Sequence, residues 1–152
     1  MSSSPTQTVK VFTIDQANSM LPLVQVITAD LVQLSSDLNA RRERIVELQR
    51  HNSQTSGTGF HGEELSQSKA DLEHDALKLQ EYVEELRELG VEPKSGPEGL
   101  VDFPALIDGR LVYLCWKLGE PTVSHWHELD GGFAGRQLIA DCTSFHKDED
   151  IA

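Results

Sequence analysis

The stretch with the clearest chemical potential is His125-Trp126-His127-Glu128, in the last fifth of a 152-residue chain. If this stretch is a strand, residues two apart point to the same side, so the imidazoles of His125 and His127 lie about 6–7 Å apart. Two imidazoles at that spacing can bind one metal ion. The pattern therefore predicts a metal site on a strand near the C-terminal end.

Other residue types in this half of the chain could complete the coordination of a metal. Asp102 supplies a carboxylate, Cys115 a thiolate, and Glu128 a second carboxylate at the strand end. Nitrogen, sulfur and oxygen donors together suit a late divalent transition metal, with zinc the best fit. A metal-bound water would then be the reactive group of a hydrolase, although the sequence leaves open whether the protein is an enzyme. The predicted ligand set is His125, His127, Asp102, Cys115 and Glu128.

Two other interpretations of these residues remain open. The histidines could pair with Asp102, with Glu128 or with a backbone carbonyl, and so only shape a polar surface. Cys115 could act as a nucleophile with His125 as its base, although a cysteine inside a strand is more often an inert packing residue.

A glycine-rich loop, residues 130–136, follows the histidines and ends in a cation, Arg136. Exposed backbone amides together with a guanidinium can hold a carboxylate or a phosphate, so Arg136 is a candidate anion-binding residue. The spacing matches neither the Walker A motif nor the dinucleotide-binding fingerprint. A loop that needs positive φ angles explains the glycines equally well.

A small antiparallel sheet is expected to position these residues. Residues 100–107 and 110–118 flank Asp108-Gly109, a dipeptide typical of a type I′ hairpin turn, so paired residue numbers should sum to 217. Residues 123–129 form a plausible third strand, and burying Trp126 in the core sets its register at a sum of about 240. That register places His125 beside Cys115. Pro104 indicates an edge or a bulge, because proline donates no ladder hydrogen bond.

A long antiparallel helical hairpin is predicted over residues 13–90. Thr13 and Gln16 form a capping-box pattern at its start, and apolar residues then recur at intervals of three and four. The polar segment 52–59 reads as the connecting loop. With the turn centred near residue 56, Arg41 should reach Asp71 or Asp75.

The hairpin and the sheet together predict an α+β fold, with the helices packed on the sheet. The apolar residues Val32, Val46, Leu77 and Val83 lie outside the helical seam, so they must meet the sheet or a second subunit. A homodimer is therefore expected. This gives an alternative function, a non-catalytic dimeric interaction or scaffold module that acts through the hairpin.

Composition bounds these expectations. Thirteen Lys+Arg against 25 Asp+Glu give a net charge of -12, which disfavours nucleic acid as a partner. The chain has no apolar run of membrane-spanning length and no secretory pattern at its start, and it contains two cysteines, so a cytoplasmic protein is expected. Residues 9–145 suit a single domain. Residues 1–8 are predicted to be a disordered lead and residues 146–152 an acidic tail.

Several segments together resemble an uncharacterised bacterial family, domain of unknown function 2203. They are Phe12 to Asn18 with Leu21-Pro22, Gly99 to Pro104, Leu114-Cys115-Trp116, Leu118-Gly119-Glu120 and the run from His125 to Gln137. The resemblance spans about residues 10–140. It implies a small cytoplasmic bacterial protein and no particular activity, and it assigns no functional residue.

Overall fold

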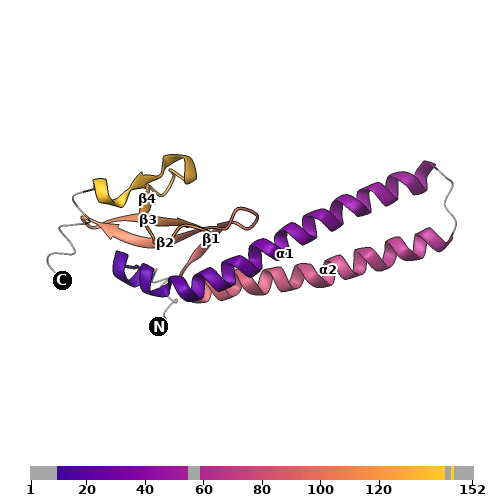
Figure 1. Ribbon diagram of the computed structural model, residues 1–152, viewed down its shortest axis with the longest axis horizontal. Coiled ribbons are helices and arrows are strands. Elements are labelled where there is room, and N and C mark those ends of the chain that lie inside the picture. Colours follow the sequence, from indigo (N-terminus) through magenta and orange to yellow (C-terminus); the bar gives the residue numbers. More distant parts are fainter. Residues whose placement is uncertain (1–9, 55–58, 143–144, 146–152) are drawn as a thin grey trace, which may run out of the picture.

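The protein is α+β, with a long helical hairpin and a five-stranded sheet, in a computed structural model that describes residues 10–54, 59–142 and 145 (Figure 1). Helix α1 spans Ile14–Gln54 and helix α2 spans Gly59–Glu88. The two helices run side by side, and the sheet lies at the end of the hairpin that holds the start of α1. The predicted lead (residues 1–8) and acidic tail (residues 146–152) lie outside the described residues.

The start of α1 has the predicted capping box. The Thr13 amide donates to the side-chain oxygen of Gln16 at 2.9 Å, and the Gln16 amide donates to the Thr13 hydroxyl at 3.0 Å. The connection between the helices is shorter than the predicted loop, residues 52–59, because α1 continues to Gln54 and α2 already begins at Gly59.

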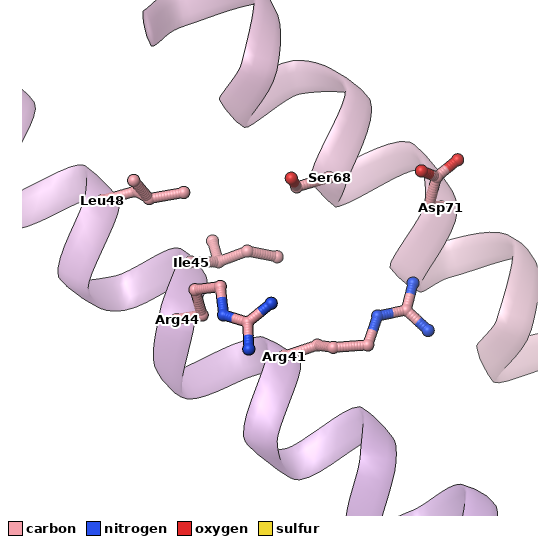
Figure 2. A pocket seen from close by; sticks show the side chains of 6 residues that line it. All are labelled: Arg41, Arg44, Ile45, Leu48, Ser68 and Asp71. Carbon is pink, nitrogen blue, oxygen red and sulfur yellow. The ribbon is translucent and has the colours of Figure 1, made fainter.

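Arg41 forms the predicted contact across the hairpin seam, with Asp75 of α2 as its partner at 2.6 Å. It also pairs with Asp37 of its own helix at 3.3 Å. Figure 2 shows this side chain reaching from α1 towards α2 beside a small pocket of about 100 Å³. Hydrogen bonding to Asp75 raises the pKa of Arg41, and the same contact lowers the pKa of Asp75. Arg41 therefore serves hairpin pairing, whereas Arg42 and Arg50 contact Asn39 and Glu47 of their own helix.

The sheet is antiparallel, with strand order β1-β2-β3-β4-β5. The strands are β1 (Glu92–Ser95), β2 (Leu100–Ile107), β3 (Arg110–Lys117), β4 (His125–His127) and β5 (Gln137–Leu138). The two short edge strands β1 and β5 were not predicted. The third strand was predicted over residues 123–129, and in the structure it is the three-residue strand β4.

Both predicted registers are confirmed. Leu100 pairs with Lys117 across β2 and β3, a sum of 217, and Cys115 pairs with His125 across β3 and β4, a sum of 240. Asp108 and Gly109 have φ angles of 52° and 78°, as the two central positions of a type I′ turn require. Pro104 lies beyond the last β2 residue that pairs with β1, so its missing N–H interrupts no ladder on that side.

The core lies between one face of the sheet and the first half of α1. One face of the β2–β3 hairpin is fully buried, and Trp126 joins it at 6% exposure. Its members are Val101, Phe103, Ala105, Ile107, Val112, Leu114 and Trp116. The opposite face of the sheet carries Asp102 and Cys115, so the candidate site faces away from the helices.

Candidate metal site

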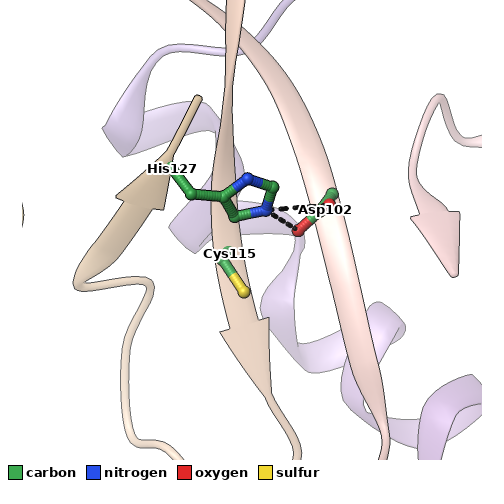
Figure 3. Close-up of side chains that lie close together, drawn as sticks. All are labelled: Asp102, Cys115 and His127. Atoms are coloured by element: carbon green, nitrogen blue, oxygen red, sulfur yellow. Dashed lines mark hydrogen bonds and ion pairs between the residues drawn. The ribbon is translucent and has the colours of Figure 1, made fainter. Parts of the chain in front are cut away.

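Asp102, Cys115 and His127 come together on the open face of the sheet, one from each of β2, β3 and β4 (Figure 3). Their ligand atoms lie within 4.8 Å of one another, and the three side chains are 1%, 2% and 2% exposed. Among the residues that the structure describes, no other cluster of three such side chains meets this limit. We call these three residues the metal group.

His127 has the hydrogen-bond geometry of a metal-binding histidine. Its Nδ1 lies 2.6 Å from the backbone carbonyl oxygen of Glu128, so Nδ1–H donates to that carbonyl. The other nitrogen, Nε2, lies 3.1 Å from both carboxyl oxygens of Asp102, so His127 makes the contacts with Asp102 and with a backbone carbonyl that the polar-pairing interpretation of the histidines predicts. A ligating imidazole usually donates its second N–H to a carbonyl or a carboxylate, and that bond fixes which nitrogen faces the metal. The backbone of β4 thus directs Nε2 to Asp102 and Cys115.

Burial makes it unfavourable for Asp102 and Cys115 to carry negative charge when no cation is bound. It raises the pKa of the Cys115 thiol to about 12, and the Asp102 charge adds to this shift. Burial also raises the pKa of Asp102, with the His127 charge opposing it. A divalent cation would reverse both shifts, because it favours the thiolate and the carboxylate directly.

The same shift argues against the nucleophile interpretation of Cys115. With a pKa of about 12, the side chain is a thiol at neutral pH, whereas a nucleophilic cysteine needs a thiolate. His125, its predicted base, is directed elsewhere: Nδ1 of His125 lies 3.1 Å from the Ser124 hydroxyl and 3.7 Å from the Glu120 carboxylate.

Three of the predicted site residues therefore lie apart from the metal group. His125 approaches Glu120, and the Glu128 carboxylate forms an ion pair with Arg110. Arg136, the candidate anion-binding residue, pairs with Glu120 at 2.5 Å and lies over the Phe133 ring at 4.7 Å. Its guanidinium Nε is buried without a hydrogen-bond partner among the described residues.

The polar turn at Glu120 explains the positions of His125 and Arg136. One carboxylate oxygen of Glu120 accepts the Lys117 amide at 2.8 Å, and its backbone carbonyl accepts the indole N–H of Trp116 at 2.9 Å. The turn is thereby fixed to β3, and the remaining carboxylate oxygen is available to Arg136 and His125. Arg136 thus anchors the glycine-rich loop to this turn.

A cavity of about 200 Å³ opens over the metal group. The glycine-rich loop forms part of its wall through Asp130, Gly132 and Phe133. Of the glycines in that loop, Gly132 has a positive φ, 61°, so the conformational explanation holds at that position. Lys94 of β1 also lines the cavity. Sequence reasoning missed Lys94, because a four-residue strand that contains a proline carries no periodic signal.

Comparison with known proteins identifies a family. No curated protein and no solved structure matches the chain. Residues 10–139 match the model of a family described as an uncharacterized conserved protein, DUF2203, which confirms the resemblance seen in the sequence motifs. The match contains all three residues of the metal group. The chain belongs to the DUF2203 family.

Proposed function

We propose that this protein binds one divalent transition metal, zinc by preference, through Asp102, Cys115 and His127, and uses a metal-bound water to hydrolyse a small substrate. The observation that carries the proposal is the orientation of His127, whose Nδ1–H is held by the Glu128 carbonyl while Nε2 faces two further ligand side chains. Structural zinc sites are closed by four protein ligands, whereas catalytic sites use three and leave a position for water. Three ligands beneath a cavity match the catalytic arrangement.

Cobalt titration of the full chain tests the proposal. Cobalt(II) occupies zinc sites and gives a thiolate-to-cobalt charge-transfer band when a cysteine is a ligand. We expect that band to saturate at one cobalt per chain and to be absent from Cys115→Ser. Cys142→Ser is the matched control, because Cys142 lies outside the metal group. Saturable cobalt binding without the thiolate band, or binding that persists unchanged in Cys115→Ser, would overturn the assignment.

The affinity for cobalt should rise with pH. The Cys115 thiol, with a pKa raised to about 12 by burial, must lose its proton when the metal binds, and the raised pKa of Asp102 acts in the same direction. Below these pKa values protons compete with the metal, so the apparent affinity should increase about tenfold per pH unit for each proton released. Cobalt titrations at several values between pH 6 and 8 give the slope. An affinity that does not depend on pH would show that Cys115 is not deprotonated by the metal.

A second candidate function, a dimeric interaction module, is favoured by two stripes on the hairpin. Leu77 is 67% exposed on α2, and Glu73 and Glu81 lie one turn to either side of it. Val46 is 48% exposed on α1, between Arg42 and Arg50. Both stripes have an apolar centre, so a second copy of the chain could place one against the other. On α1 the two arginines alternate with Glu43 and Glu47, and Arg50 pairs with Glu47. Val83, by contrast, packs against the core. The sequence predicted that this residue would meet either the sheet or a second subunit, and the structure shows a contact within the chain.

Substituting Leu77 by Asp tests this surface. We expect a dimer in sedimentation equilibrium of the wild-type chain, and at least about a tenfold weaker dimer in Leu77→Asp, because a carboxylate would face the acidic stripe of its own helix and lose the apolar contact. Leu23→Asp is a suitable control, since Leu23 is 50% exposed on α1 and lies far along that helix from Val46. A monomeric wild-type chain would rule out the dimeric module.

A further inference from the structure

The cavity over the metal group has a cationic side chain, that of Lys94, on its wall. The pairing of β1 with β2 is regular at Glu92 and Pro93 and then shifts, so that Ser95 lies opposite Leu100 and Lys94 has no partner of its own. An extra residue of this kind bends the strand and redirects a side chain, and such irregularities are enriched beside active sites. The shift therefore accounts for a charged side chain at this position.

Lys94 lines the cavity, and its charge also acts on the Asp102 carboxylate there. Its ammonium lies 5.0 Å from the centre of the Tyr113 ring, on the same face of the sheet as the metal group. Within the described part of the chain it forms no ion pair, in contrast to Arg136, which is held by Glu120. Of the two cations, Lys94 is therefore the one placed to meet an anion in the cavity.

The other cavity walls limit what that anion can be. Leu100, Leu129 and Phe133 provide an apolar surface, and the carboxylate of Asp130 lines the cavity as well. A negative charge beside a single lysine opposes a dianion such as phosphate more than a monoanion. The volume, about 200 Å³, is below the range of roughly 300–1,000 Å³ that is usual for drug-sized ligands.

We infer that the cavity binds a small monocarboxylate with a short apolar chain, with its carboxylate on Lys94 and its chain against Phe133 and Leu129. This inference rests on the proposed function, because it places over the metal group the acid that hydrolysis of an ester or amide would release. It makes Lys94, and not Arg136, the residue that selects for an anionic ligand. Lys94 is then a binding residue, and it takes no part in holding the metal.

Butyrate is a suitable probe, used with the full chain loaded with cobalt. We expect saturable changes in the cobalt absorption bands and in the amide NMR signals of Lys94 and Gly132. The neutral analogue butyramide should bind at least about tenfold more weakly, and inorganic phosphate should not bind more tightly than butyrate. Lys94→Met should weaken butyrate binding about tenfold or more, while Lys94→Arg should keep it within a few-fold.

Lys117→Met is the matched control. Lys117 lies on the same face of the sheet with its ammonium 5.4 Å from the Phe133 ring, but it does not line the cavity. Butyrate affinity should change less than about twofold in that variant. Equal loss in both variants, no loss in Lys94→Met, or tighter binding of phosphate would overturn the inference. A chain that binds cobalt but not butyrate overturns this inference alone, whereas a chain that binds no cobalt overturns the proposed function and this inference with it.

Discussion

His127→Gln should lower the affinity of the full chain for cobalt by about 100-fold or more. An imidazole nitrogen is a strong ligand and an amide is a poor one, and loss of even an outer-shell partner commonly costs 10–100-fold. Glutamine places an N–H donor near the position of Nε2, so it can donate to the buried Asp102 carboxylate. The variant should therefore fold while it fails to bind metal. Cobalt titration followed by absorption measures the change, and circular dichroism checks the fold.

His125→Gln is the control that separates the two histidines. Both lie on β4, two residues apart, but only His127 belongs to the metal group, and His125 approaches Glu120. We expect the cobalt affinity of His125→Gln to stay within about threefold of the wild-type value, well short of what loss of a ligand would cost. An equal loss in both variants would return the site to the His125–His127 pair that the sequence pattern first suggested.

Trp116→Ala should reduce the free energy of unfolding by about 3–5 kcal/mol. Trp116 is fully buried between the sheet and the helices, and its indole N–H donates to the Glu120 carbonyl at 2.9 Å. The substitution leaves a large cavity and also removes the bond that holds the Glu120 turn. Since small domains are stable by only about 5–15 kcal/mol, this is a large share of the total. Urea unfolding followed by far-ultraviolet circular dichroism gives the value.

Leu106→Ala is the control for this prediction. Leu106 lies on β2, on the opposite face of the sheet, and is 47% exposed. Removing its side chain should cost less than about 1 kcal/mol, because little apolar surface is lost from the core. Similar losses in the two variants would mean that the core does not lie where the burial of Trp116 places it.

The sequence was most informative about the sheet where turn chemistry and burial act together. Asp108-Gly109 sets the register of β2 and β3, because few residue pairs accept two positive φ angles in succession. The requirement to bury Trp126 then sets the register of β4, since a shift of one residue would move the indole to the open face. Both registers followed from local rules, and so did the capping box at Thr13.

Those rules did not predict which of the two histidines belongs to the metal group. The register places His125 directly beside Cys115, yet it is His127, two pairs further along, that reaches Cys115 diagonally. Two contacts produce this result: the carbonyl of the next residue, Glu128, holds the His127 ring, and Glu120 of the preceding turn lies near His125. Side-chain direction on a strand depends on such neighbours, and periodicity carries no information about them.

The place of Lys94 in the cavity wall could not be predicted from the sequence for a related reason. Lys94 lies on a short edge strand whose pairing shifts beside Pro93, and no hydrophobic period marks such a strand. Arg136 was correctly placed beside the glycine-rich loop, but its partner Glu120 is sixteen residues away and their pairing depends on the folded turn.

The sequence predicted no membrane-spanning segment, and the helices of the structure can be compared with that prediction. Neither α1 nor α2, over the residues described, combines the length and the apolar character that crossing a bilayer requires. Both helices instead carry charged residues along most of their length.

The most direct measurement of the central claim is the metal content of the full chain, purified without an affinity tag and without added metal. Inductively coupled plasma mass spectrometry should find about one zinc, or another divalent transition ion, per chain in the wild-type protein and in His125→Gln, and almost none in His127→Gln. A wild-type chain that carries no transition metal and binds none on addition would contradict the account, as would a metal content that His127→Gln leaves unchanged.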